Sequence, residues 1–223
     1  MTSTRAVDAV LFDLDGTLVD SLETIAEAMV IALHTFGYTI DVPTLIPMIG
    51  PPMEVVALNL GAPADEAARI NAEYIRLYHH GYVQRTPEHP GASALLERLA
   101  AAGMVLGVVT NKVEEGARLV VDAERWNDRF GVVVGRDTPN SAAKPAPEAA
   151  LHALRVLGIA PEHAAFVGDT EFDMRCGRAA GLARVIGLVG NRDASLLRAE
   201  GATDLVHSLD EVGTLLLGAE ATS

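Results

Sequence analysis

Short apolar runs alternate with longer segments of helical periodicity along most of the chain. Residues 9–12 read Ala-Val-Leu-Phe and run into Asp13 and a glycine turn, which is typical of a buried strand. From residue 22 apolar side chains recur at helical spacing, with Ser21 as the expected N-cap and Gly37 as the end. The chain is therefore predicted to open with a strand and an amphipathic helix.

The stretch from residue 17 to residue 88 shows no strand signal. Prolines and glycines break it between residues 43 and 52. Two further helices are expected around residues 55–60 and 70–77, where apolar side chains again follow helical spacing. This stretch is predicted to be a helical insertion.

Beyond residue 90, apolar runs and helical segments alternate. The runs cover residues 105–109, 132–134, 164–167 and 183–188, and the helices 92–102, 114–125, 147–157, a segment closing at Gly181, and 210–217. Continuous apolar strands between helices predict a parallel sheet covered on both faces.

These patterns predict an α/β fold in which a parallel-sheet, Rossmann-like core is interrupted by a small α-helical cap. The core is expected to comprise residues 1–16 and 89–223, and the cap residues 17–88. Residues 219–223 are expected to form a frayed tail.

The amino-acid composition excludes several classes of protein. The 223 residues are 49% hydrophobic and 21% charged, enough apolar surface to exclude a disordered chain. A formal charge of −13 repels nucleic acids and anionic membranes, so neither is an expected partner. The single cysteine, Cys176, excludes an internal disulfide and a multi-thiolate metal site. Without an apolar stretch of signal-peptide or membrane length near the start, a cytoplasmic protein is expected.

Polar side chains cluster where the predicted strands end, the edge at which open α/β sheets bind ligands. They are Asp13, Asp15, Thr110, Asn111, Lys112, Asp169 and Asp173, with Lys144 in the loop ahead of Pro145. Carboxylates gathered at one edge raise one another's pKa unless a cation joins them. A hard divalent ion, most simply Mg²⁺, together with a phosphate ligand would resolve this repulsion.

Four segments in this order resemble the motifs of the haloacid dehalogenase-like (HAD) hydrolase superfamily. They are residues 13–21 (DLDGTLVDS), 110–112 (TNK), 144–145 (KP) and 168–173 (GDTEFD). More narrowly, residues 7 to about 210 resemble phosphoglycolate-phosphatase-like members, which carry a helical cap after the first motif. The resemblance implies a Mg²⁺-dependent phosphatase acting on a small phosphorylated metabolite.

The resemblance also implies a role for each motif position. Asp13 would attack phosphorus and form an aspartyl phosphate, and Asp15 would protonate the leaving group and then deprotonate the hydrolytic water. Mg²⁺ would be held by the carboxylates of Asp13 and Asp169 and by the backbone carbonyl of Asp15.

Phosphate oxygens would be held by the Thr110 hydroxyl and the Asn111 backbone N–H. Lys144 would pair with the phosphate and with Asp13, and Asp173 would position Lys144 or a metal-bound water. Two plainer readings stay open for the fourth motif, in which Asp169 is a helix N-cap and Asp173 a first-turn acid. Lys112 is expected to be a solvated loop residue.

Other reactions of the superfamily fit this chain less well. Dehalogenases of the family lack the second acid and the metal. The phosphonatase needs a cap lysine, but the two lysines of the chain are Lys112 and Lys144. The β-phosphoglucomutase-like enzymes use a cap histidine where Ile25 stands, together with a cap lysine. A phospho-receiver signalling module, a different class, would have no cap insertion. Hydrolysis of a phosphate monoester is the expected reaction.

The leaving group is less constrained. A small carboxylated monoester such as 2-phosphoglycolate is the first candidate, with nucleotides, sugar phosphates and pyrophosphate as alternatives. Apart from histidines, the basic side chains of the cap are Arg69, Arg76 and Arg85. The loop Ile49-Gly50-Pro51-Pro52-Met53 leads into a helix whose N–H groups could receive a carboxylate, or it is simply a rigid turn.

Overall fold

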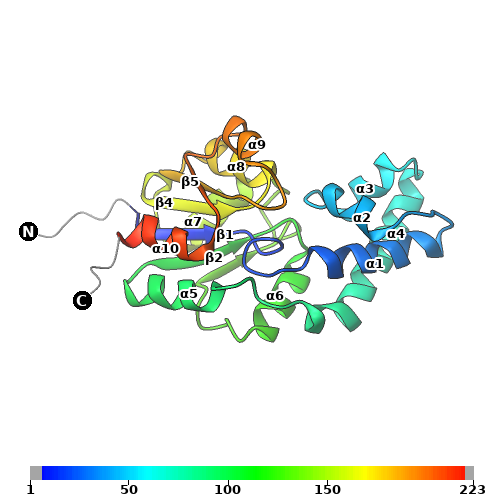
Figure 1. The fold of residues 1–223 in the computed structure, drawn as a ribbon, viewed down its shortest axis with the longest axis horizontal. Helices are drawn as coiled ribbons and strands as arrows, with labels where there is room; N and C mark the ends of the chain where they lie inside the picture. The colour runs from blue at the N-terminus through cyan, green and yellow to red at the C-terminus, as the bar shows by residue number, and fades with distance from the viewer. Residues whose placement is uncertain (1–6, 219–223) are drawn as a thin grey trace, which may run out of the picture.

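A computed structural model describes residues 7–218 and shows an α/β fold built on a six-stranded sheet (Figure 1). All neighbouring strands are parallel, in the order β3-β2-β1-β4-β5-β6. The strands are β1 (Ala9–Phe12), β2 (Val105–Val109), β3 (Val132–Val134), β4 (Ala164–Gly168), β5 (Arg184–Leu188) and β6 (Asp204–Val206). The predicted α/β class with a parallel sheet is confirmed.

Strand β1 lies in the middle of the sheet, between β2 and β4. Its side chains alternate between faces, so Val10 and Phe12 join one apolar cluster and Ala9 and Leu11 another. The run is apolar throughout because both of its faces are buried. The carboxyl end of β1 consequently lies at the centre of the sheet edge.

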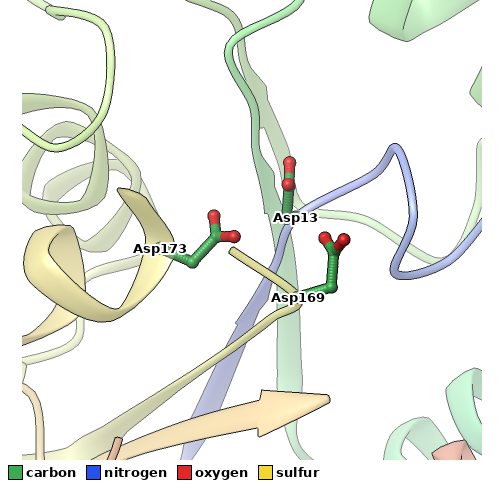
Figure 2. Close-up of side chains that lie close together, drawn as sticks. All are labelled: Asp13, Asp169 and Asp173. Atoms are coloured by element: carbon green, nitrogen blue, oxygen red, sulfur yellow. The ribbon is translucent and has the colours of Figure 1, made fainter. Parts of the chain in front are cut away.

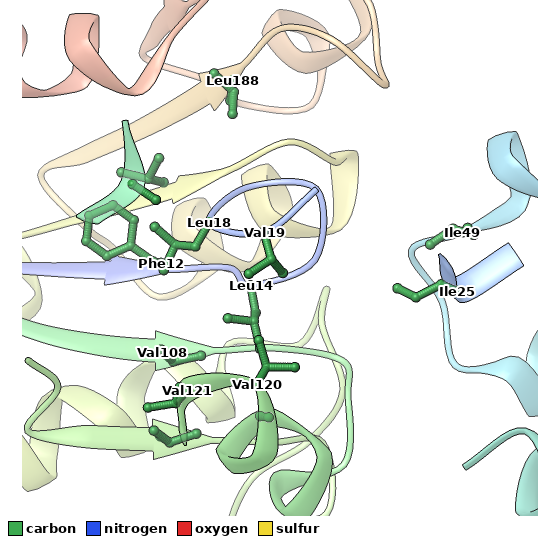
Figure 3. Close-up of a cluster of buried hydrophobic side chains, with 14 of the residues drawn as sticks. Phe12, Leu14, Leu18, Val19, Ile25, Ile49, Val108, Val120, Val121 and Leu188 are labelled. Atoms are coloured by element: carbon green, nitrogen blue, oxygen red, sulfur yellow. The ribbon is translucent and has the colours of Figure 1, made fainter. Parts of the chain in front are cut away.

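Helices cover both faces of the sheet. On the Phe12 face lie α5 (Ala92–Ala101), α6 (Glu114–Ala123) and α10 (Leu209–Leu217). Figure 3 shows part of this cluster, with Val120 and Val121 of α6 beside Val108 of β2. The other face is covered by α7 (Glu148–Leu157) and by α8 (Glu171–Ala179), which a 3₁₀ turn (Pro161–His163) and β4 separate along the chain.

Residues 17–88 lie between β1 and α5 and are here called the helical segment. This segment forms no strand of the described sheet. Its helices gather beyond one end of the sheet in Figure 1. They are α1 (Leu22–Thr35), α2 (Val42–Leu45), α3 (Met53–Asn59) and α4 (Ala64–Leu77), with 3₁₀ turns at Ile46–Met48 and Val83–Arg85 and a π-helical turn at Tyr78–Tyr82. The expected strand-free, helical character is confirmed.

Some local features differ from the sequence expectations. Ser21 precedes α1 but makes no side-chain cap, because its hydroxyl donates to Asp15 instead. Helix α9 (Ala194–Ala199) and strand β6 were not predicted, because both are too short to show a clear period. The tail expected at residues 219–223 lies outside the described residues.

Within residues 7–218, no helix combines the length and the apolar character that a membrane crossing requires.

Candidate active site

Three of the predicted acidic residues meet at the carboxyl ends of the two central strands, β1 and β4. Asp13 follows β1, Asp169 follows β4, and Asp173 lies on the first turn of α8. Figure 2 shows the three side chains converging, and a carboxylate oxygen from each lies within 4.8 Å of the others. All three residues are buried. The strand order explains the meeting, since β4 pairs directly with β1.

Lys144 lies among these acids. Its Nζ is 2.8 Å from Asp13 Oδ1, an ion pair without hydrogen-bond geometry, and it donates to Asp173 Oδ1 at 2.6 Å. The side chain of Lys144 is 2% exposed. Because burial makes an unpaired charge costly, the ammonium and the carboxylates depend on one another.

Asp173 has two tasks in the structure. Its Oδ2 accepts hydrogen bonds from the backbone N–H and the hydroxyl of Thr170, at 2.9 and 2.6 Å, which forms a capping box at the start of α8. Its Oδ1 holds Lys144. The N-cap of α8 is Thr170, so the plainer reading of Asp169 as the cap is wrong, while Asp173 is both a first-turn acid and the partner of Lys144.

The electrostatic balance of this cluster is negative. Burial, reinforced by repulsion from Asp173, raises the pKa of Asp13 to about 7, although Lys144 opposes the change. Burial and the same repulsion raise the pKa of Asp169 well above its ordinary value. Three buried carboxylates therefore face one ammonium, and the cluster favours a further cation.

The residues present fit a hard divalent cation. Asp169 Oδ1 accepts a hydrogen bond from the Thr17 hydroxyl at 3.1 Å, but its buried Oδ2 has no hydrogen-bond partner among the described residues. A Cβ placed on Gly16, whose φ is +80°, would lie 2.5 Å from that Oδ2, so only glycine leaves the oxygen accessible. Because both oxygens of Asp173 are already engaged, Asp13 and Asp169 are the carboxylates best placed to bind the ion.

Asn111 has a role that the sequence did not indicate. Its Oδ1 accepts from the Lys144 backbone N–H at 2.7 Å, and its Nδ2 donates to the Lys144 carbonyl at 3.2 Å and to the Gly50 carbonyl at 2.9 Å. The Lys144-Pro145 peptide bond is cis. The amide thus joins the loop after β2, the Lys144 loop and the helical segment, a link between distant positions that no local pattern announces.

The expectation that Lys112 is solvated is wrong. Its Nζ lies 3.1 Å from Asp15 Oδ2 and 3.8 Å from the centroid of the Tyr78 ring, and the side chain is 6% exposed. The other oxygen of Asp15 accepts a hydrogen bond from the Ser21 hydroxyl at 2.8 Å. The backbone N–H of Lys112 donates to the buried Thr110 hydroxyl at 3.2 Å. Asp15 is therefore held on both sides, by Ser21 and by Lys112.

A pocket lies between this sheet edge and the helical segment. The pocket holds about 700 Å³ of empty space, a figure that includes space open to solvent. Asp13, Asp15, Thr110, Asn111, Lys112 and Asp169 line one wall, whereas Lys144 and Asp173 lie behind them. The opposite wall, from the helical segment, is mostly apolar and includes Leu22, Ile25, Met29, Met53 and Tyr74.

The loop before α3 is docked onto the core. The Arg192 guanidinium donates to the Ile49 carbonyl at 3.0 Å and to Glu171 at 2.8 Å, and Asn111 holds the Gly50 carbonyl. These contacts support the rigid-turn interpretation of this loop. The alternative, a carboxylate at the N-terminus of α3, has weak support because that helix has only 7 residues.

Comparisons with known proteins agree with this geometry. The family model of haloacid dehalogenase-like hydrolases matches residues 10–187. The chain is 35% identical over 187 residues to a phosphoglycolate phosphatase of Xanthomonas campestris pv. campestris, covering 82% of this chain and 84% of the relative. It is 34% identical over 222 residues to a phosphoglycolate phosphatase of Chromobacterium violaceum, covering 95% and 97%. A solved structure described as a predicted phosphatase from Clostridium acetobutylicum superposes with a TM-score of 0.87 at 26% identity, over 96% of this chain and 99% of the other.

Proposed function

The chain belongs to the haloacid dehalogenase-like hydrolases and is a phosphatase of that family, and from this premise we propose that it hydrolyses a small phosphate monoester through an aspartyl phosphate on Asp13. The observation that carries the proposal is the placement of Asp13, which lies at the centre of the sheet edge, ion-paired with Lys144 and beside Asp169. Asp15, two residues on, lines the same pocket.

The first step transfers the phosphoryl group to the protein. A carboxylate oxygen of Asp13 forms a bond to phosphorus while the bond from phosphorus to the leaving oxygen breaks. Asp15 gives its proton to that leaving oxygen, which departs as an alcohol. Lys144 favours the ionised Asp13 that the attack needs, against the burial that disfavours it.

The second step returns the protein to its starting state. Asp15, now a carboxylate, removes a proton from a water molecule whose oxygen bonds to phosphorus. The bond between phosphorus and the Asp13 oxygen breaks, and inorganic phosphate leaves. The Thr110 hydroxyl and the Asn111 backbone N–H are proposed to hold the phosphate oxygens during both steps, since both residues line the pocket.

Mg²⁺ is the cation we assign to Asp13 and Asp169, with the Asp15 backbone carbonyl as a third ligand. When bound, it would neutralise charge on the phosphoryl group as that group transfers. The fit rests on the uncompensated carboxylate oxygens described above, and the choice of Mg²⁺ over other hard cations rests on its preference for few carboxylates plus phosphate.

The helical segment is proposed to act as a cap domain, residues 17–88, on a core of residues 1–16 and 89–223. It supplies the apolar wall of the pocket and so excludes water from the reacting phosphate. The negative charge of the chain supports a free metabolite as the substrate, without nucleic acid or membrane partners. A cytoplasmic location is proposed as well, since a single cysteine forms no internal disulfide and fits a reducing compartment.

Phosphoglycolate is the first substrate we propose, because the relatives from Xanthomonas campestris and Chromobacterium violaceum are named as phosphoglycolate phosphatases. The test is phosphate release from a panel that contains phosphoglycolate, a sugar phosphate, a nucleoside monophosphate and pyrophosphate, with and without Mg²⁺. Mg²⁺-dependent turnover that is highest for phosphoglycolate supports the proposal. The absence of turnover on every member would overturn it, and preference for another member would reassign the leaving group alone.

A further inference from the structure

The positive charge that faces the leaving-group side of the pocket comes from the core and not from the arginines of the helical segment. Arg76 pairs with Glu73 at 2.7 Å, Arg85 pairs with Glu27 at 2.8 Å, and Arg69 lies 3.6 Å from Glu66. Of the described residues that line the pocket, none is one of these arginines. Lys112 and Arg136, both from loops at the sheet edge, do line it.

Lys112 is built into its position. Its aliphatic stem packs over Gly116, where an added Cβ would lie 3.2 Å from the Lys112 Cγ and Cδ atoms. Its carbonyl accepts the backbone N–H of Arg136 at 3.1 Å, so the two basic residues are held together. The Arg136 guanidinium is itself fixed by a hydrogen bond to Asn71 Oδ1 at 3.2 Å. The pair therefore joins two sheet-edge loops and the helical segment.

The Lys112 ammonium retains capacity for a ligand. It has three N–H donors, and among the described residues it pairs with one carboxylate, that of Asp15, with Tyr78 and Tyr74 also beside it. The Asp15 carboxylate beside it favours the charged form of the ammonium, so the side chain is a buried cation on the pocket wall.

The position of Lys112 relative to Asp15 defines what it can recognise. Asp15 is the proposed proton donor to the leaving oxygen, so that oxygen must lie next to the Asp15 carboxylate during transfer. The Lys112 ammonium lies 3.1 Å from Asp15 Oδ2. It is therefore close enough to contact a substrate group that is separated from the leaving oxygen by one carbon atom. In a 2-hydroxy acid that group is the carboxylate.

We propose that Lys112, supported by Arg136, is the subsite that binds an anionic group of the leaving alcohol and so selects monoesters of short hydroxy acids over neutral alcohols. This inference rests on the proposed function and deepens it, because it names the residue and the charge that determine the substrate class. Charge-assisted contact to a carboxylate is of the strength needed for such selection. The apolar wall opposite, from Ile25 to Met53, offers a neutral alcohol no comparable polar contact.

The experiment compares two monoesters of matched size, 2-phosphoglycolate and 2-hydroxyethyl phosphate, whose leaving groups differ in charge. The measured quantity is the ratio of their kcat/KM values in saturating Mg²⁺. For the wild-type protein we expect a ratio of about 10 or more in favour of phosphoglycolate. A wild-type ratio near 1 together with measurable turnover overturns the subsite and leaves the phosphatase function intact. Absence of turnover on both esters contradicts the function itself.

Variants of Lys112 and Arg136 test whether these side chains determine the ratio of the two kcat/KM values. Lys112→Met keeps the apolar stem and removes the charge, and it should lower the ratio to near 1, a fall of about 10-fold or more. Arg136→Met should lower it less, and Lys112→Arg should retain a preference for the anion. If Lys112→Met does not fold, as thermal unfolding would show, the Arg136→Met ratio and the wild-type ratio decide the matter.

Arg76→Met is the matched control, since it removes a positive charge from an exposed pair outside the pocket. Its ratio should equal that of the wild-type protein. A Lys112→Met protein that loses both substrates by the same factor would show that Lys112 acts through Asp15 and not on the leaving group, and would contradict the proposal.

Discussion

The two lysines of the chain lie near each other but differ in their surroundings, one being enclosed by acids and the other lining the pocket. Lys144 lies behind the acids, between Asp13 and Asp173, and is enclosed by the core. Lys112 lies on the pocket wall with Asp15 as its carboxylate partner and Tyr78 of the helical segment over it. Each pairs with one acid of the first motif. In the proposed function, Lys144 serves the phosphoryl group, whereas the charge of Lys112 is proposed to bind the leaving group.

The largest expected effect concerns the acid paired with Lys144. Asp13→Asn keeps the shape of the side chain and removes the nucleophile, so kcat should fall by about 10⁴-fold or more for every monoester. Steady-state phosphate release measures this loss. Retention of more than a few percent of the activity would mean that a different group attacks phosphorus.

Lys144→Met should be the next most damaging change. It leaves Asp13 and Asp173 without their ammonium, and kcat should fall by about 10²- to 10³-fold for phosphoglycolate and 2-hydroxyethyl phosphate alike. The matched variant Lys144→Arg should recover little, because a planar guanidinium fits poorly between two buried carboxylates. If kcat fell for phosphoglycolate alone, Lys144 would act on the leaving group as Lys112 is proposed to do, and the distinction between the two lysines would be contradicted.

The acidic cluster around Lys144 should also affect stability as pH changes. Burial raises the pKa of Asp13 from 3.8 to about 7, so ionising it disfavours the folded state as pH rises through that interval. In EDTA, Asp13→Asn should therefore exceed the wild-type protein in unfolding free energy by about 1–3 kcal/mol at pH 8 and by much less at pH 4. Urea unfolding at the two pH values measures the difference. Equal stability at pH 8 would contradict the raised pKa, and Mg²⁺ should stabilise the wild-type protein more than the variant.

The smallest effect on catalysis is expected from a change next to Asp15, the partner of Lys112. Ser21→Ala removes the hydrogen bond to Asp15 Oδ1 but leaves Lys112 on Oδ2. We expect kcat/KM to fall by about 3- to 10-fold on both substrates without a change in their ratio, because the proton donor is less well oriented. A loss as large as that of Lys144→Met would show that Lys112 alone cannot hold Asp15.

Much of the fold and of the Lys144 site can be predicted from the sequence. Asp13 and Asp15 follow an apolar run that predicts a buried strand, and neighbouring parallel strands bring their carboxyl ends together. Strand β6, by contrast, has only 3 residues, and its place at the sheet edge depends on pairing with β5. Residues 204–206 alone show no period that would predict it.

The surroundings of Lys112 could not be predicted from the sequence, because its contacts depend on how the helical segment packs against the core. Tyr78 is far from Lys112 along the chain, and the Ser21 hydroxyl satisfies Asp15 rather than the helix that follows it. The same holds for the Asn111 amide, which reaches the Gly50 carbonyl. The sequence places Lys112 in the second motif, residues 110–112, but no local pattern indicates its contacts.

The most direct test of the division between the two lysines is the decay rate of the aspartyl phosphate itself. The leaving group has departed when this intermediate forms, so a residue that recognises it should matter for formation and little for decay. Rapid-quench measurements with ³²P-labelled phosphoglycolate should show that Lys112→Met slows formation far more than decay, while Lys144→Met slows both. Decay slowed by Lys112→Met as strongly as formation would contradict the account.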